Sequence, residues 1–169
     1  MLWLAMAGSF IIFLFILLTF GIRKSGSDYK VIQLPVYFYV STLIISLSSA
    51  TLLYAQYTFK TERYRVFYQF KLATLVLAVV FCMLQILGWA QLLKEGIFFD
   101  NSIFGAFIYI LTGLHLAHIF LGIFGLCVVL YDARKNASYV DGYLLSLNPM
   151  KLTRIKLVAY FWHFIDVLW

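Results

Sequence analysis

Three histidines and one aspartate are the residues of this sequence best able to do chemistry, because all four stand within long apolar stretches. His115 and His118 lie in the run LTGLHLAHIFLG, and His163 and Asp166 lie in the run YFWHFIDVLW. An unpaired imidazole or carboxylate is costly in hydrocarbon, so these side chains must face another helix, a cavity or a bound group. They could ligate a metal, relay protons or form hydrogen bonds between helices.

A helix through the first run would gather its polar and small residues on one side. At helical spacing that side carries Thr112, His115, His118, Gly122 and Gly125, and the other side carries Ala117, Phe120 and Phe124. The first side is therefore predicted to be a packing seam with hydrogen-bonding capacity.

The second run spaces Tyr160, His163 and Asp166 at i, i+3 and i+6, close enough to share a helix face. Counted from Lys156, Asp166 lies roughly 15 Å along the helix, near the middle of a bilayer, where a charge costs about 2.5–3.5 kcal/mol. Its carboxyl group must be paired or protonated. By the same arithmetic the two other histidines lie near the middle of the preceding helix, so depth predicts one polar layer containing the three histidines and Asp166.

Three kinds of active site compete with a structural role for these residues. A haem would take imidazoles from different helices, whereas His115 and His118 are one turn apart on one helix. A di-iron centre needs several carboxylates, and Asp166 is the only one within an apolar block. A proton-coupled transporter could use Asp166 with His163, yet the sequence has neither an inverted repeat nor a pair of interrupted helices. Hydrogen bonding between helices, or to lipid headgroups or a partner subunit, fits the residues best.

The composition is that of an integral membrane protein. Of the 169 residues, 64% are hydrophobic and only 12% are charged, whereas apolar usage in soluble domains is about half. The net charge of +6 comes from basic residues in short segments between apolar blocks. Such residues are typical of orientation signals, so nucleic acid is not an expected partner.

The apolar blocks predict an all-α fold, a polytopic transmembrane bundle that occupies residues 1–169 as a single domain. Five helices are expected, over about residues 2–22, 34–57, 67–93, 102–130 and 157–169. The last block is too short to span a bilayer, so its helix is expected to continue past Trp169. The polar segment 132–156 is expected to lie on the membrane surface.

The second helix is expected to bury one polar face against protein. Its members are Thr42, Ser46, Ser49 and Gln56. In the third helix Thr74, Gln85 and Gly88 share a face in the same way.

Lysine and arginine are unequally divided between the loops. The second and fourth loops hold nine, which are Lys60, Arg63, Arg65, Lys71, Arg134, Lys135, Lys151, Arg154 and Lys156. The first and third loops hold four, which are Arg23, Lys24, Lys30 and Lys94. The positive-inside rule places the nine in the cytoplasm, and the amino end with them.

Taken together, these motifs resemble subunit III of the haem–copper respiratory oxidases, cytochrome c oxidase in particular, in its short five-helix bacterial form. The matching residues are Ser41-Thr42 and Ser48-Ser49, Gln85 with Trp89, Phe104-Gly105, Leu111-Thr112-Gly113-x-His115-x-x-His118 with Gly122, and Trp162-His163-Phe164-x-Asp166-Val167-x-Trp169. They span nearly the whole chain in the order found in the family.

The resemblance implies an accessory subunit of an oxidase that reduces oxygen to water. In this family the haems and copper belong to subunits I and II, so no cofactor is expected on this chain. Subunit III packs on subunit I, binds phospholipid, and supports proton uptake and resistance to inactivation during turnover. The candidates for lipid contacts or for the polar layer are His115, His118, His163, Asp166, Gln85, Trp89 and Trp162. The implied setting is a bacterial cell membrane, with membrane lipids and a larger respiratory supercomplex as further partners.

Two departures limit what the resemblance carries over. Fuller members have seven helices, and this chain is expected to correspond to the last five, without the part of a V-shaped lipid cleft that the first two helices build. The family often has an intramembrane acid in the helix that corresponds to the first one here, where Ser9 stands instead. Relatives in quinol oxidases and nitric oxide reductases share the same motifs, so the electron donor stays open.

Overall fold

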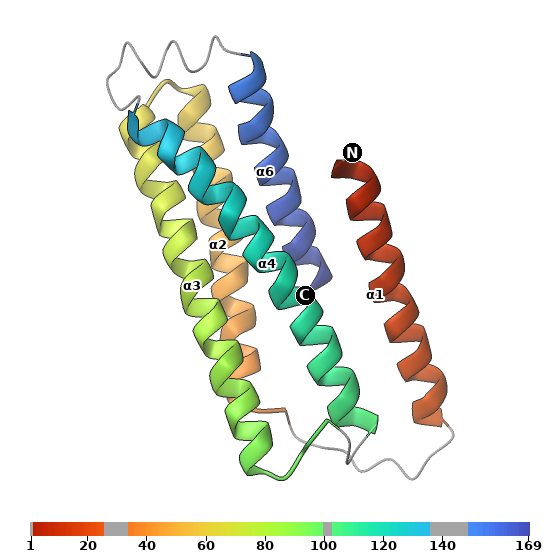
Figure 1. Cartoon of the computed structure of the whole chain (residues 1–169). Helices are drawn as coiled ribbons and strands as arrows, with labels where there is room; N and C mark the ends of the chain where they lie inside the picture. The colour runs from red at the N-terminus through yellow and green to blue at the C-terminus, as the bar shows by residue number, and fades with distance from the viewer. Residues whose placement is uncertain (1, 26–33, 100–102, 136–148) are drawn as a thin grey trace.

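The computed structural model describes residues 2–25, 34–99, 103–135 and 149–169, which are almost entirely helical (Figure 1). The helices are α1 (Leu2–Ser25), α2 (Val36–Lys60), α3 (Tyr64–Lys94), α4 (Ile103–Lys135) and α6 (Pro149–Leu168). Four segments, Leu2–Arg23, Val36–Lys60, Tyr64–Lys94 and Phe104–Asp132, are long and apolar enough to cross a membrane. The described part of the chain is thus an all-α, multi-pass membrane bundle.

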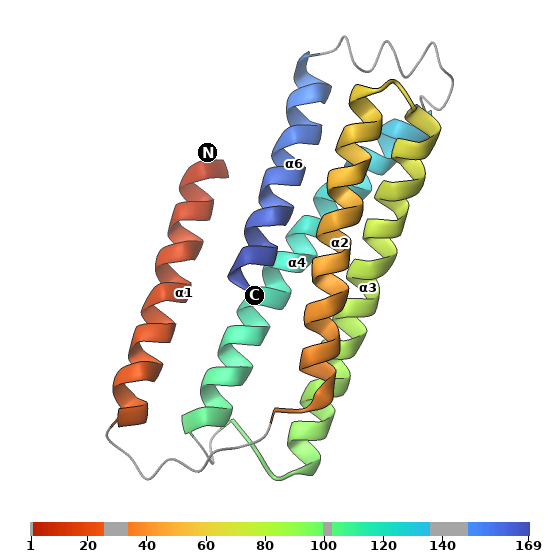
Figure 2. The ribbon, with the colours of Figure 1, turned by 180° about the vertical axis from the view of Figure 1, so that it is seen from behind.

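The helices pack unevenly. α2 and α3 form an antiparallel pair with extensive contact along its length (Figures 1 and 2). α4 crosses obliquely and contacts α3 and α6, while α6 also contacts α2. α1 stands at the edge of the bundle, where its main contacts are with α4 and α6.

The α3 helix shows how this sequence specifies a bundle. Its buried residues include Tyr64, Phe67, Lys71, Thr74, Ala78, Phe81, Gln85, Gly88 and Leu92. These residues are separated alternately by three and four positions, the repeat that keeps one seam of a helix facing its neighbours. Apolar side chains such as Val76, Met83 and Ile86 are exposed on the other faces, as expected for contact with lipid.

The last helix begins earlier than predicted. It starts at Pro149 rather than near Leu157, so residues 149–156 are helical instead of lying as a surface segment. Proline suits the first helical position because its φ is already helical and the N–H it lacks would have no partner there. Residues 132–135 likewise continue α4, and residues 136–148 lie outside the described residues.

The buried face of α2 is displaced from the predicted one. The residues that face the bundle are Ser41, Ile45, Ser48, Leu52 and Ala55. Thr42 and Ser46, which were expected inside, are exposed, while Ser49 and Gln56 lie half-buried at the border. The alternation of four and three positions seen in α3 also governs α2, and it brings the apolar Ile45 and Leu52 into the seam.

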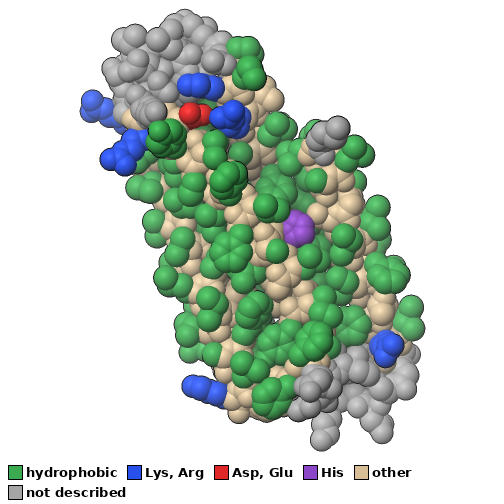
Figure 3. Space-filling model, viewed as in Figure 1, with side chains coloured by type: hydrophobic (Ala, Val, Ile, Leu, Met, Phe, Trp, Pro, Cys, Tyr) green, Lys and Arg blue, Asp and Glu red, His purple; other side chains and the backbone are tan. Residues whose placement is uncertain are grey.

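Basic side chains gather at the end of the bundle where α2 meets α3 and where α6 begins (Figure 3). Lys60, Arg63 and Lys156 are exposed at this end. The turn between α2 and α3 is tight, because the Arg63 N–H donates to the Thr58 carbonyl at 2.9 Å. Glu62 adopts a positive φ of 59° in this turn, as a helix C-terminus of the Schellman type requires.

Candidate functional site

His118 joins α4 to α1. Its Nε2 lies 2.8 Å from Ser9 Oγ, and its Nδ1 lies 2.7 Å from the Leu114 carbonyl oxygen. A carbonyl only accepts, so in the neutral ring Nδ1 carries the proton and Nε2 accepts from the serine hydroxyl. The Ser9 hydroxyl has a single proton, for which the Ala5 carbonyl at 2.9 Å competes.

His163 joins α6 to α2. Its Nδ1 lies 2.6 Å from Ser49 Oγ, while its Nε2 is buried without a partner among the described residues. Both carboxyl oxygens of Asp166 are also buried without a hydrogen bond to a described residue, although Ser49 is close enough to interact with this side chain. Ser49 of α2 therefore lies near both His163 and Asp166 of α6.

His115 is enclosed by aromatic rings. It is fully buried, and neither ring nitrogen has a hydrogen-bond partner in the described structure. The ring centroids of Trp169, Phe81 and Phe13 lie 4.9, 5.7 and 6.5 Å from that of His115. The Trp169 indole is held in turn by a 2.8 Å hydrogen bond from its N–H to Thr42 Oγ1. His115 thus packs as an aromatic residue between α1, α3 and the carboxyl end of the chain.

The predicted polar layer is divided between two seams. His118 faces α1 through Ser9, whereas His163 and Asp166 face α2 through Ser49. No hydrogen bond or ring contact of the described residues joins His163 or Asp166 to a histidine of α4. Similar depth in the membrane did not bring the histidines of α4 into contact with His163 and Asp166. The faces of α4 and α6 that carry these residues turn to different neighbouring helices.

Gln85, Trp89 and Trp162 form hydrogen bonds across helices. The Gln85 amide donates to Ser41 Oγ at 2.8 Å, the Trp89 indole to Thr112 Oγ1 at 2.9 Å, and the Trp162 indole to Ser48 Oγ at 3.1 Å. Each pairs a long polar side chain with a small hydroxyl, the common way of satisfying polar groups between membrane helices.

Gly122 makes room for Trp162. A Cβ atom at this glycine would lie 2.9 Å from Cζ3 of the indole, closer than van der Waals contact allows. The Trp162 side chain is completely buried. The glycine that sequence reasoning placed in the packing seam of α4 therefore permits the close approach of α6.

Lys71 was missed as a buried residue, because it was counted with the basic loop before α3. It lies inside α3, is completely buried, and its Nζ has no hydrogen-bond partner in the described structure. The amine stands 5.2 Å from the centroid of the Phe67 ring, one turn away. The signal was present in the sequence, since Phe67, Lys71 and Thr74 continue the alternation of three and four that marks the α3 seam.

Most of the polar side chains described above form hydrogen bonds between helices. Among the residues that the structure describes, no group of three or more histidine, cysteine, aspartate or glutamate side chains could hold a metal ion. The polar groups are distributed singly along the seams, most of them facing a hydroxyl of the neighbouring helix.

Comparison with known proteins gives a consistent result. A sequence model of the family described as cytochrome c oxidase subunit III matches residues 26–169. A cytochrome c oxidase subunit 3 from Corynebacterium diphtheriae is 31% identical over 152 residues, which cover 88% of this chain and 67% of the relative. A cytochrome bo(3) ubiquinol oxidase subunit 3 from Buchnera aphidicola is 23% identical over 172 residues, which cover 99% of this chain and 80% of the relative. A cytochrome c oxidase subunit 3 from Bacillus sp. (strain PS3) is 28% identical over 172 residues, which cover 99% of this chain and 78% of the relative.

Proposed function

Because the chain belongs to the cytochrome c oxidase subunit III family, we propose that it serves as an accessory subunit of a haem–copper terminal oxidase. The observation that carries the proposal is the family match over residues 26–169, which includes α2, α3, α4 and α6. In this role the chain packs against subunit I and accompanies subunit II. Those two subunits hold the haem and copper centres that reduce oxygen to water.

The electron donor is either cytochrome c or a quinol. Both kinds of oxidase occur among the relatives, since the Corynebacterium protein is named for cytochrome c and the Buchnera protein for ubiquinol. The donor docks on other subunits, so the proposal for this chain is the same in both cases.

The proposed setting is a bacterial cell membrane with the amino end in the cytoplasm. The α2–α3 turn and the start of α6 lie at the same end of the bundle, and basic side chains gather there (Figure 3). The positive-inside rule supports a cytoplasmic location for that end. Since α1 runs antiparallel to α2, its first residue lies on the same side.

The hydrogen bonds between helices support a role in keeping the assembled enzyme intact during turnover. Residues such as Gln85, Trp162 and His163 fasten α3 and α6 to α2. A rigid subunit of this kind can hold phospholipid and its partner in a fixed arrangement, which protects the catalytic subunit and its proton uptake.

The proposal is tested by purifying the tagged full chain from native membranes in a mild detergent. We expect subunits I and II to co-purify, with a reduced-minus-oxidised spectrum of oxidase haems and with oxygen consumption from either cytochrome c or quinol. The isolated chain should show no haem spectrum. A haem bound to the isolated chain, or a preparation free of oxidase subunits, would contradict the proposal.

The role of the polar residues is tested in the assembled enzyme with His163→Ala and Asp166→Ala. We expect faster loss of activity during turnover and a lower content of bound lipid, with Asp166→Asn as the conservative control. If assembly, lipid content and inactivation rate are all unchanged, these two residues have no such role.

A further inference from the structure

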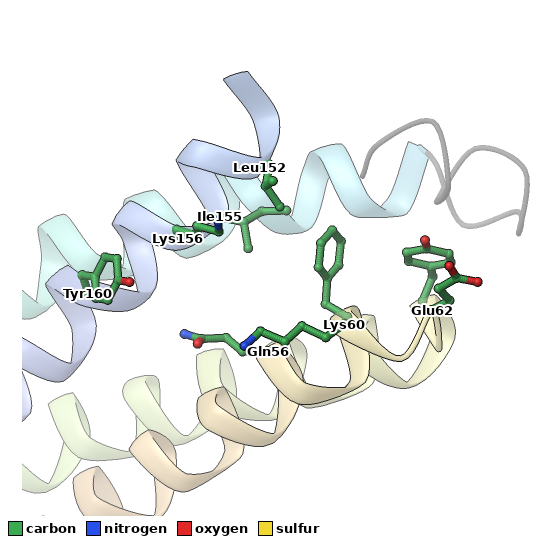
Figure 4. Close-up of a pocket in the computed structure, with 9 residues that line it drawn as sticks. Gln56, Lys60, Glu62, Leu152, Ile155, Lys156 and Tyr160 are labelled. Atoms are coloured by element: carbon green, nitrogen blue, oxygen red, sulfur yellow. The ribbon is translucent and has the colours of Figure 1, made fainter. Parts of the chain in front are cut away.

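A pocket of about 510 Å³ lies between α2 and α6 at the basic end of the bundle, away from the polar residues described above. Its lining residues are Gln56, Phe59, Lys60, Glu62, Tyr64, Leu152, Ile155, Lys156 and Tyr160. Figure 4 shows those from α2 and its following turn on one side of the gap and those from α6 on the other. The volume is in the range of sites that bind small molecules or part of a larger one.

The charges of the pocket favour an anion. Lys60 and Lys156 face it from opposite helices, and neither forms an ion pair with a described residue. Glu62, at the outer edge, is the only acid among the lining residues, so the lining carries a net positive charge. Gln56 and the Tyr160 hydroxyl add hydrogen-bond donors on the inner side.

The rest of the lining is apolar. Phe59 and Ile155 are buried lining residues, and the partly buried Leu152 packs against their cluster. Tyr160 is 53% exposed and packs against Trp3 of α1, with ring centroids 6.1 Å apart. Tyrosine and tryptophan, with lysine nearer the aqueous side, are typical of the membrane interface, where the polar headgroup of a lipid joins its acyl chains.

We propose that this pocket binds the headgroup of an anionic glycerophospholipid. The phosphate lies between the ammonium groups of Lys60 and Lys156, and the acyl chains run past Tyr160 along α6 toward the bilayer centre. A lipid is favoured over a soluble anion because five of the nine lining residues are apolar or aromatic. The inference deepens the lipid-binding part of the proposed function, but it does not depend on the oxidase assignment, since the site lies within this chain.

The test uses the full chain in detergent and measures phosphatidylglycerol retained in native mass spectrometry. We expect the double substitution Lys60→Gln with Lys156→Gln to weaken binding by about 10- to 30-fold, because each basic residue near the membrane surface attracts anionic lipid. The matched control is Arg23→Gln with Lys94→Gln, in the last turns of α1 and α3. Those helix ends lie at the opposite end of the bundle (Figure 1), so the control should leave binding unchanged.

A second variant separates a built pocket from a merely basic surface. Leu152→Trp fills the cavity and keeps both lysines, so it should also reduce retention of phosphatidylglycerol. Equal retention by this variant, equal binding of phosphatidylcholine or phosphatidylethanolamine, or displacement by millimolar inorganic phosphate would each overturn the proposal. Failure to co-purify oxidase subunits would affect only the proposed function.

Discussion

α1 and α2 have nearly the same length, 24 and 25 residues, and both are strongly apolar, yet they are held in the bundle by different means. Five hydroxyl groups of α2 form hydrogen bonds with side chains of α3, of α6 or of Trp169 directly after α6, and they belong to Ser41, Thr42, Ser48, Ser49 and Thr51. Among described residues, α1 has one such bond, from Ser9 to His118. The buried side chains of Phe13 and Met6 also pack α1 against the bundle.

The difference shows which helix organises the bundle. Hydrophobic burial gives little preference between protein and lipid, so membrane helices associate through close packing and hydrogen bonds. α2 supplies both kinds of interaction to two neighbours, whereas α1 supplies few to either of its own. The family match, which begins at residue 26, includes α2 and leaves α1 outside.

The largest expected difference is between two tryptophans. Trp162 lies on α6 and is bonded to α2, whereas Trp3 lies on α1. Trp162→Ala removes a completely buried ring that is bonded to Ser48 of α2, and it should lower the free energy of unfolding by about 3–5 kcal/mol. Trp3→Ala removes a ring that is 64% exposed on α1 and should change stability by less than about 0.5 kcal/mol. Thermal unfolding of the purified chain in detergent measures both. Similar losses would mean that α1 is as firmly integrated as α6.

Two glycines provide a comparison of packing alone. Gly122→Ala places a methyl group 2.9 Å from the Trp162 ring, so overpacking should cost about 1–3 kcal/mol. Gly8→Ala on α1 meets no atom within 4 Å and should be neutral or slightly stabilising. The same thermal measurement decides between them, and an equal tolerance at both positions would show that α6 can move away from α4 at no cost.

Lys71 tests whether hydrogen-bond partners explain the stability of the α2–α3 pair. Thr74 and Gln85, on the same face of α3, each meet a hydroxyl of α2, but Lys71 meets none. Replacing a buried, unpartnered amine by an apolar side chain of similar length should stabilise the chain, so Lys71→Met should gain about 1–2 kcal/mol. Lys94→Met, at the exposed end of α3, is the control and should not raise the free energy of unfolding. A loss of stability in Lys71→Met would reveal an interaction of the amine.

The sequence was sufficient for the helices and for the polar faces of α3 and α4, but not for the buried face of α2 or for the hydrogen-bond partners between helices. The apolar blocks predicted five helices. Ala117, Phe120 and Phe124 were predicted on the side of α4 opposite its packing seam, and all three are exposed in the structure. Pairings such as Ser9 with His118 depend on how helices far apart in sequence are placed around one another, which periodicity within one helix does not contain. Lys71 was misplaced for a different reason, since nearby basic residues suggested a loop and outweighed the register of α3.

The smallest expected effects come from two serine–histidine pairs that are chemically alike. Ser49→Ala and Ser9→Ala each remove one hydrogen bond between helices, of 2.6 and 2.8 Å, and each should cost only about 0.6 kcal/mol. Their consequences should nevertheless differ in location. Ser49 lies in a seam that Ser48 and Thr42 also fasten, whereas Ser9 forms the hydrogen bond that ties α1 to α4.

Hydrogen exchange of the chain in lipid nanodiscs can detect this difference. Ser9→Ala should increase exchange in α1 with little change elsewhere, because a helix with few other attachments opens locally at a low free-energy cost. Ser49→Ala should leave exchange in both α2 and α6 close to that of the unmodified chain. Thr19→Ala is the matched control on α1, since its hydroxyl has one partner among the described residues, the Phe15 carbonyl of the same helix. If Ser9→Ala and Thr19→Ala change α1 equally, the bond to His118 does not hold this helix, and packing through Phe13 and Met6 is sufficient.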